Sequence, residues 1–154
     1  MISDGNDHNP TRIFLREMPT GTSTSVNVGF NATMNWGCTI RNLVVVTPAS
    51  GLSVVATDTQ RVASGTTCST NVDTFEGGLV CAIMGQRDME TSTPNVTWTG
   101  ITERGEWQQG TGDSHGYAYN IPTATESNRL VRINLSNGSG DEAKVTTAAF
   151  RVAP

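Results

Sequence analysis

The stretch from Gly77 to Asp88 constrains the fold more than any other part of the chain. Its centre, Leu79-Val80-Cys81-Ala82-Ile83-Met84, is apolar at every position, with Gly-Gly before it and Arg-Asp soon after it. The run is too short to span a membrane. It fits either a strand buried on both faces or a short core helix, and the glycines and the strand-like flanks favour the strand.

The composition of the 154 residues agrees with a strand-rich protein. Hydrophobic residues make up 36% and charged residues only 16%, while threonine is the commonest residue and glycine occurs 16 times. Such a chain prefers strands and turns, and it lacks the Glu-, Lys-, Leu- and Ala-rich stretches that form helices. Its length suits one domain that buries about 70% of its unfolded surface.

Short apolar or alternating segments recur at intervals of roughly ten residues. They predict about nine or ten strands and no helix, which is typical of a two-sheet sandwich. We therefore predict an all-β fold, a single antiparallel β-sandwich over residues 11–154 after a flexible N-terminal arm over residues 1–10. A β-barrel or jelly-roll-like arrangement is the alternative. The expected strands include Arg12–Arg16, Ser25–Phe30, Thr39–Thr47, Leu52–Thr57, Leu79–Met84, Val96–Trp98, Ile101–Trp107, His115–Tyr119, Leu130–Leu135 and Ala143–Val152.

Three connections carry specific expectations. Pro48–Gly51 predicts a turn after which Leu52–Thr57 forms the second arm of a hairpin. Asn137–Asp141 is the strongest hairpin signal, because Asn-Gly accepts positive φ. Ser64–Thr74 is polar, and we expect an exposed loop or a weak edge strand there.

The charge pattern excludes several classes of partner. The net charge is −4, and Lys144 is the single lysine among scattered arginines. Nucleic-acid binding and polybasic membrane binding both need clustered cations, so neither is expected. No stretch of about 18 apolar residues predicts a membrane span. The polar, acidic N-terminus does not resemble a signal peptide, and Met1 favours a protein made in the cytoplasm over one whose signal was removed.

The cysteines predict no metal site. Cys38, Cys68 and Cys81 are widely spaced and form no Cys-x-x-Cys pair. Buried free thiols are the expected state. A Cys38–Cys81 or Cys68–Cys81 disulfide is the alternative.

No group of residues in the sequence is a strong candidate for a catalytic site. Asp113-Ser114-His115, with Glu103 and Glu106 upstream, contains residue types used in acid–base and metal sites, but it lies among glycine-rich turns and exposed strand positions. No Gly-x-Ser-x-Gly motif is present. The acidic fragments near Asp4 and Asp141 lack the alternating oxygen ligands of a calcium loop. We predict no enzyme, no metal site and no cofactor.

Aromatic residues are the better candidates for contact. His115, Tyr117 and Tyr119 alternate with small residues and so share one face of a strand, and Trp107 lies between two polar residues. We expect these four to be core, subunit-contact or partner-contact residues, with sugar stacking as the alternative. Trp98 is expected in the core.

A sequence pattern in the second half of the chain resembles the β-sandwich proteins of phage virions, of the capsid-decoration, head-fibre or tail-associated type. The pattern consists of a buried strand after small residues, a Pro-x-x-x-Trp segment, an aromatic strand and a final strand ending in an aromatic. These are Glu76–Ala82, Pro94–Trp98, Tyr117–Tyr119 and Ala148–Val152. The resemblance implies a structural or adhesive role and supplies no catalytic residues.

The resemblance implies a non-enzymatic virion protein, most simply a capsid decoration (cement) protein. It would be made in the host cytoplasm, form a homotrimer, and bind the major capsid protein or another virion protein through apolar and backbone contacts. The polar arm, with Asp4, Asp7, His8 and Arg12, would order on contact with the capsid. The alternative is a carbohydrate-binding module that presents Trp107, Tyr117 and Tyr119 to a glycan.

Overall fold

The computed structural model describes residue 13 and residues 52–63, 65–87, 96–109, 113–136 and 142–152. These residues form eight strands and no helix, which confirms the predicted all-β class. The strands are β1 (Leu52–Val62), β2 (Thr67–Thr74), β3 (Leu79–Arg87), β4 (Val96–Thr99), β5 (Glu103–Gln109), β6 (Asp113–Asn120), β7 (Glu126–Leu135) and β8 (Glu142–Val152).

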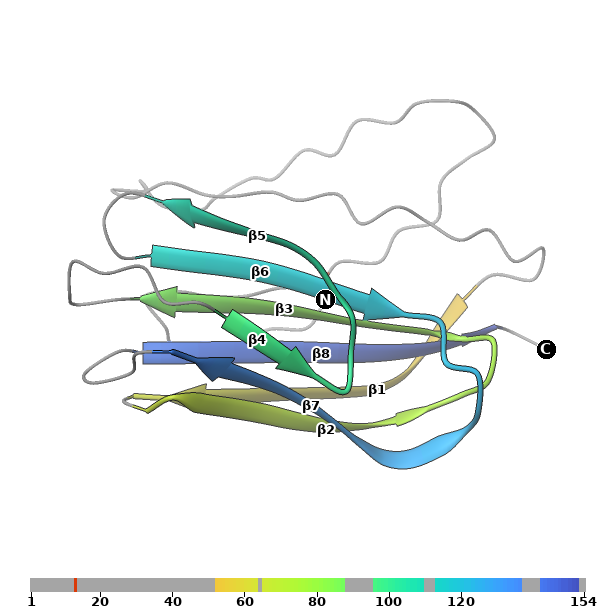
Figure 1. Ribbon diagram of the computed structural model, residues 1–154. Helices are drawn as coiled ribbons and strands as arrows, with labels where there is room; N and C mark the ends of the chain where they lie inside the picture. The colour runs from red at the N-terminus through yellow and green to blue at the C-terminus, as the bar shows by residue number, and fades with distance from the viewer. Residues whose placement is uncertain are drawn as a thin grey trace, which may run out of the picture.

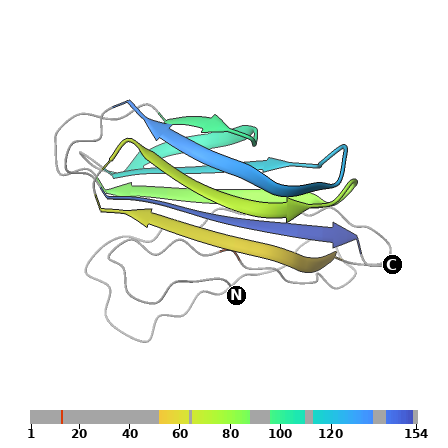
Figure 2. The same ribbon diagram turned by 90° about the horizontal axis from the view of Figure 1, so that it is seen from below.

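The strands form two antiparallel sheets that face each other (Figures 1 and 2). The larger sheet has the order β1-β8-β3-β6-β5, and the smaller one has the order β2-β7-β4. Two separate sheets with a shared core are a sandwich and not a closed barrel.

Strand β3 occupies the centre of the larger sheet, as its apolar sequence requires. It pairs with β8 on one side and β6 on the other. Val80, Ala82 and Met84 point into the space between the sheets, and Leu79 and Cys81 belong to a second cluster. Since alternate side chains of a strand point to opposite faces, an unbroken apolar run fits only a strand that is covered on both sides.

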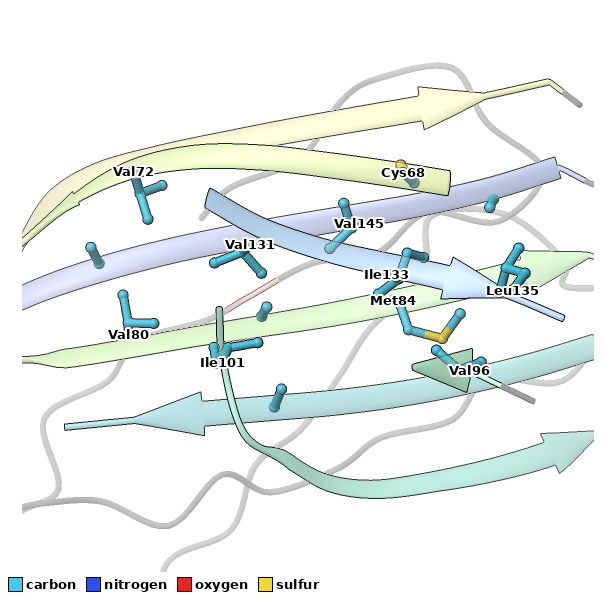
Figure 3. Packing of buried hydrophobic residues seen from close by; sticks show 14 residues of the cluster. Cys68, Val72, Val80, Met84, Val96, Ile101, Val131, Ile133, Leu135 and Val145 are labelled. Atoms are coloured by element: carbon cyan, nitrogen blue, oxygen red, sulfur yellow. The ribbon is translucent and has the colours of Figure 1, made fainter. Parts of the chain in front are cut away.

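The main core fills the space between the two sheets (Figure 3). Val131, Ile133 and Leu135 of β7 face the larger sheet and alternate with partly exposed residues of the same strand. A buried hydrogen bond of 2.6 Å between the Thr70 and Thr147 hydroxyls joins the sheets inside this core. When the Thr147 hydroxyl donates to Thr70, the Thr70 hydroxyl donates in turn to the Val131 carbonyl at 3.5 Å, so both buried donors have an acceptor.

The outer face of the larger sheet carries the second cluster. Leu79, Cys81, Ala148 and Phe150 are buried there, and the partly buried Ile13 and Tyr119 pack against them. Strand β8 is buried on both faces from Ala143 to Phe150. Lys144 is 1% exposed in this strand, and burial lowers its pKa.

The prediction of a hairpin at Asn137–Asp141 is wrong. Strand β7 lies in the smaller sheet beside β2 and β4, whereas β8 lies in the larger sheet between β1 and β3. The chain therefore crosses between the sheets instead of pairing back on itself. Turn chemistry permits a reversal, but β8 is apolar on both faces and is buried best at an interior position of the larger sheet.

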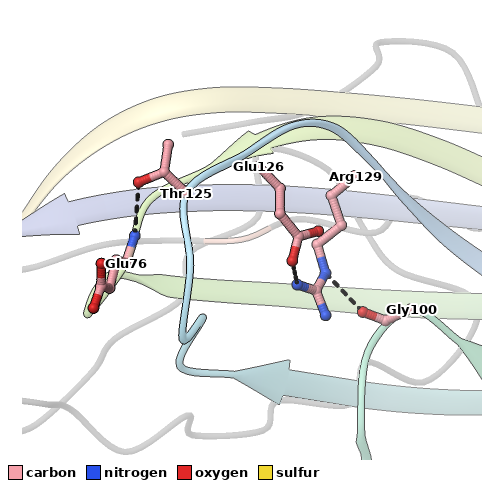
Figure 4. Close-up of polar contacts among 5 residues, drawn as sticks. All are labelled: Glu76, Gly100, Thr125, Glu126 and Arg129. Carbon is pink, nitrogen blue, oxygen red and sulfur yellow. Dashed lines mark hydrogen bonds and ion pairs between the residues drawn. The ribbon is translucent and has the colours of Figure 1, made fainter.

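The chain crosses between sheets again from β4 to β5, at Gly100. Its φ of 80° is in the left-handed region, and a Cβ there would lie 1.9 Å from the Leu130 carbonyl oxygen. The Arg129 Nε donates a 2.9 Å hydrogen bond to the Gly100 carbonyl, and an Arg129–Glu126 ion pair of 3.0 Å orients the guanidinium (Figure 4). Glycine is the residue that fits this crossing.

The segment Ser64–Thr74 differs in part from expectation. It contains β2, an edge strand of the smaller sheet, which was one of the two predicted states. An exposed loop is excluded, because Cys68, Thr70, Val72 and Thr74 are all buried. Three of these four inward positions carry a polar or thiol group, so the apolar alternation that identifies a strand is absent from the sequence.

Candidate functional site

Strand β6 presents a row of rings on the outer face of the larger sheet. Ser114, Gly116 and Ala118 are buried, while His115, Tyr117 and Tyr119 are partly exposed. The shared face predicted for the three rings is therefore confirmed. The small inward-facing residues let β6 lie close to the core, and the large side chains of the strand are on its outer face.

Trp107 of β5 completes this row, because it is paired with His115 in the β5–β6 register. The Trp107 and His115 rings are stacked, with centroids 5.4 Å apart and planes 18° apart. The Trp107 and Tyr117 rings are 6.2 Å apart and tilted by 50°. We call Trp107, His115, Tyr117 and Tyr119 the aromatic row. Cross-strand aromatic pairs of this kind stabilise a sheet and hold each other in place.

Gly105 makes room for the middle of the row. It lies opposite Tyr117, and a Cβ at Gly105 would be 2.7 Å from the Tyr117 Cε1 atom. The tyrosine ring therefore covers the backbone of the glycine. A larger residue at position 105 would displace the ring, so the glycine and the tyrosine act as a pair.

Arg104 binds the far end of the row. A register shift between Glu103 and Gly105 leaves Arg104 as an extra residue in β5. Its guanidinium carbon lies 4.4 Å from the centroid of the Tyr119 ring, and its Nε donates a 3.3 Å hydrogen bond to the Tyr119 carbonyl. Sequence reasoning missed Arg104, because a bulge changes which face a side chain takes and alternation alone does not reveal it.

The acidic side chains of β5 lie on the face opposite the row. Glu106 alternates with Trp107 along the strand and is paired with the inward-facing Gly116, and Glu103 is paired with the inward-facing Ala118. Burial raises the pKa of Glu106, and the negative charge of Glu103 raises it further. The row therefore combines rings and one guanidinium on its own face, without these two carboxylates.

The residues considered for catalysis do not converge. Ser114 is buried towards the smaller sheet, and His115 lies on the outer face, so the two adjacent residues point apart. Asp113 pairs with Arg87 at one end of the sheet, and Glu103 pairs with Ala118 near the other end of β6. Within the described ranges, no group of three or more His, Cys, Asp or Glu side chains could hold a metal ion.

One side of the sandwich is closed by side chains of β1. Asp58 Oδ2 accepts a 2.8 Å hydrogen bond from the Asn71 backbone N–H, and Gln60 Oε1 accepts one from the Ser69 N–H. Both donors belong to β2, the edge of the smaller sheet. We call this the β1–β2 seam. Its acceptors satisfy backbone groups that would otherwise pair with another strand.

The opposite side of the sandwich is formed by β4 and β5. Each is the last strand of its sheet in the described part of the chain. The aromatic row runs beside this side, since Trp107 belongs to β5 itself. The two sides therefore differ: one edge is capped by side chains, and the other lies next to partly exposed rings.

Cys68 and Cys81 are free, and no disulfide joins them. Cys68 lies in the main core and donates a 3.1 Å hydrogen bond to the Gln60 carbonyl, while Cys81 lies in the outer cluster. Burial is the main cause that raises the pKa of Cys68 to about 11 and the pKa of Cys81 to about 12. These thiols stay protonated near neutral pH, as expected for structural cysteines.

Several predicted residues lie outside the described part of the chain. They are Cys38 and the proposed contact residues of the arm, Asp4, Asp7, His8 and Arg12. Trp98 is partly buried and packs against the main core, in agreement with its predicted place.

Comparison with known proteins gives no relative. No protein-family model, no curated protein and no solved structure matches this chain. Among the described residues there is no helix long and apolar enough to cross a bilayer.

Proposed function

We propose that this is a non-enzymatic structural protein of a virion, most simply a decoration protein that binds the surface of a phage capsid. The proposed partner is the major capsid protein or another virion protein, and the proposed state is a homotrimer. The proposal joins the sequence resemblance in the second half of the chain to the difference between the two sides of the sandwich.

That difference is the observation that carries the proposal. The β1–β2 seam uses Asp58 and Gln60 to occupy the backbone donors of an edge strand. Strand β5, with the aromatic row beside it, is the outermost of the described strands of the larger sheet on the other side. A protein that attaches through one side is expected to protect the edges that it does not use.

The chemistry of the row suits a protein partner. Tryptophan, tyrosine and arginine are the residues most often found at the centres of interfaces, because they bury a large area with few rotatable bonds. The stacking of Trp107 on His115 and the contact of Arg104 with Tyr119 hold the side chains in place before binding. Ordered side chains lose less entropy when a partner arrives.

Carbohydrate binding is the second candidate. The row offers ring faces with polar groups nearby, which is what sugar stacking uses. The rings do not share a plane, because Trp107 and Tyr117 are tilted by 50° and one face of Trp107 covers His115. We therefore place a protein partner first and a glycan second. A glycan array with the purified protein tests the second candidate.

The test of the virion proposal is to purify particles of the virus whose genome carries this gene. We expect mass spectrometry to find the chain in many copies per particle and immunogold labels to lie on the capsid. Absence of the chain from particles that contain the other structural proteins would contradict the proposal. Labels confined to the tail would keep a virion role and reject decoration of the capsid. Sedimentation of the free protein tests the trimer.

A further inference from the structure

The outer face of the smaller sheet is a polar surface. Val131, Ile133 and Leu135 of β7 face the core, so Arg132 and Asn134, which alternate with them, lie on the outer face. Their directly paired partners on β2 and β4 share that face. We call these two rows of side chains the polar face, and its members are Thr67, Ser69, Thr97, Thr99, Arg132 and Asn134.

Arg132 occupies the middle of its row in the polar face. It is paired with Ser69 of β2 on one side and with Thr99 of β4 on the other. It is the one charged member of the polar face, because the other five members carry hydroxyl or amide groups. No carboxylate of the polar face therefore balances the charge of Arg132.

The guanidinium of Arg132 lacks an acidic partner elsewhere as well. Within the described ranges, Arg61 pairs with Glu142 and Arg129 pairs with Glu126, whereas Arg132 makes no ion pair. Its Nε is covered by neighbouring atoms and has no hydrogen-bond acceptor, although the residue as a whole is partly exposed. Proteins rarely leave a covered donor unpaired. An arginine that is packed against a sheet without a carboxylate keeps its capacity to bind an anion from outside the chain.

Neutral hydrogen-bonding groups surround this guanidinium. The Thr67 hydroxyl donates a 3.3 Å hydrogen bond to Asn134 Oδ1, so the Asn134 amide keeps its own N–H donors for another partner. Thr97 and Thr99 are exposed on the other side of β7. Because neighbouring strands lie about 4.8 Å apart, side chains of β2 and β4 can both contact a ligand that is held at Arg132.

We propose that the polar face binds an acidic oligosaccharide. The carboxylate of a uronate or sialate residue would pair with Arg132, and the sugar hydroxyls would bond to the neutral side chains around it. Arginine suits this role because its planar guanidinium can donate two parallel hydrogen bonds to one carboxylate. The site differs from the aromatic row, which lies on the larger sheet. The inference does not depend on the virion proposal.

The composition of the polar face favours a sugar over a protein partner. The centres of protein interfaces are rich in large apolar and aromatic side chains, and the polar face has none. Leu130, the next residue of β7 on this face, is partly buried. Dense polyanions require clustered cations, but the polar face offers one arginine in a chain of net charge −4. A ligand with isolated carboxylates among neutral hydroxyls therefore matches it best.

The test is a glycan array that pairs each sialylated or uronate-containing oligosaccharide with the neutral oligosaccharide that lacks the acidic sugar. Wild type is compared with Arg132→Gln, which removes the charge, and with Arg132→Lys, which keeps the charge but not the planar guanidinium. Arg151→Gln is the matched control, because Arg151 is an exposed arginine of β8 in the other sheet. Circular dichroism verifies that each variant is folded.

We expect wild type to bind at least one acidic oligosaccharide about tenfold or more tightly than its neutral counterpart, and this binding to weaken as salt is added. Arg132→Gln should reduce it by about tenfold or more, Arg132→Lys should reduce it less, and Arg151→Gln should leave it unchanged. Absence of acid-dependent binding by folded wild type would overturn the inference, as would undiminished binding by Arg132→Gln. Binding that is lost in Trp107→Ala but kept in Arg132→Gln would overturn it too, and would assign the glycan to the aromatic row.

Discussion

At the scale of single residues, Gly100 has the least room for a side chain among the described glycines. Its backbone is left-handed, and the space for a side chain is filled by the Leu130 carbonyl. We predict that Gly100→Ala lowers the free energy of unfolding by at least about 3 kcal/mol, because it combines backbone strain with a steric overlap. Urea denaturation followed by tryptophan fluorescence measures this change.

Gly77 provides the matched control. Its φ is 70°, but nothing lies within 4 Å of a Cβ built there. Gly77→Ala should therefore cost only the strain of a left-handed alanine, about 1 kcal/mol. Equal losses for the two substitutions would show that the Leu130 contact has no role in the crossing.

The two buried thiols predict a pH dependence of stability. Their pKa values, about 11 for Cys68 and about 12 for Cys81, lie above the ordinary value of 9.0. At a pH between 9.0 and the raised pKa of each cysteine, the unfolded chain has lost the thiol proton and the folded chain keeps it. The contribution to stability is therefore complete below about pH 9 and is lost as pH rises towards 11 and 12.

This dependence is measured by comparing wild type with Cys81→Ala in urea at intervals from pH 7 to pH 10.5. We expect the wild-type free energy of unfolding to fall more steeply above pH 9 than that of the variant. Parallel curves for the two proteins would contradict the assignment of Cys81 as a thiol that stays protonated in the fold.

At the scale of strands, the β1–β2 seam should control both stability and self-association. Asp58→Ala removes the acceptor of the Asn71 N–H and the acceptor of the Thr59 N–H. We predict a loss of about 1–2 kcal/mol in the free energy of unfolding, and a new tendency to associate through the uncapped edge of β2. Urea denaturation and sedimentation at several concentrations measure the two effects.

Asp58→Asn is the comparison for the seam, since its single amide oxygen can accept only one of the two hydrogen bonds, from the Asn71 N–H or from the Thr59 N–H. With the oxygen towards Asn71, the variant should lose less stability than Asp58→Ala and remain unassociated. If Asp58→Ala sediments like wild type at every concentration, side-chain capping is not what protects this edge.

Strands were predictable where burial alone dictates their place. The unbroken apolar run of β3 identified a central strand, and the alternation of β7 identified its inward face. The connection at Asn137–Asp141 was not predictable in the same way. The residues of a turn show that the chain can reverse there. Whether the next strand then pairs with the previous one or crosses to the other sheet depends on contacts that are distant in sequence.

The same limit applies to individual side chains. Alternation placed His115, Tyr117 and Tyr119 on one face. Arg104 lies on that face because of a β-bulge, and no residue type in the sequence predicts the bulge. Lys144 alternates with the inward-facing residues of β8 and so lies on the outer face of the sheet, where a lysine is ordinarily in solvent. Both faces of β8 are nevertheless buried. The partners of a strand decide such cases, and they are not local in sequence.

At the scale of the whole molecule, the sandwich has one side capped by hydrogen bonds and another that we propose as the contact side. The β1–β2 seam caps one edge, and the aromatic row lies beside the other. The two sides therefore differ in chemistry, as the proposed attachment through one side requires.

The most direct measurement of the proposed contact side is co-sedimentation with virus particles stripped of this protein. The variant Trp107→Ala/Tyr117→Ala removes two rings of the row, and Asn71→Ala changes an exposed position at the seam as a control. We predict that the row variant binds at least tenfold more weakly, in line with the loss of about 2 kcal/mol or more for central aromatic residues, and that the seam variant binds like wild type. Undiminished binding by a folded row variant, or loss of binding by the seam variant alone, would contradict the account.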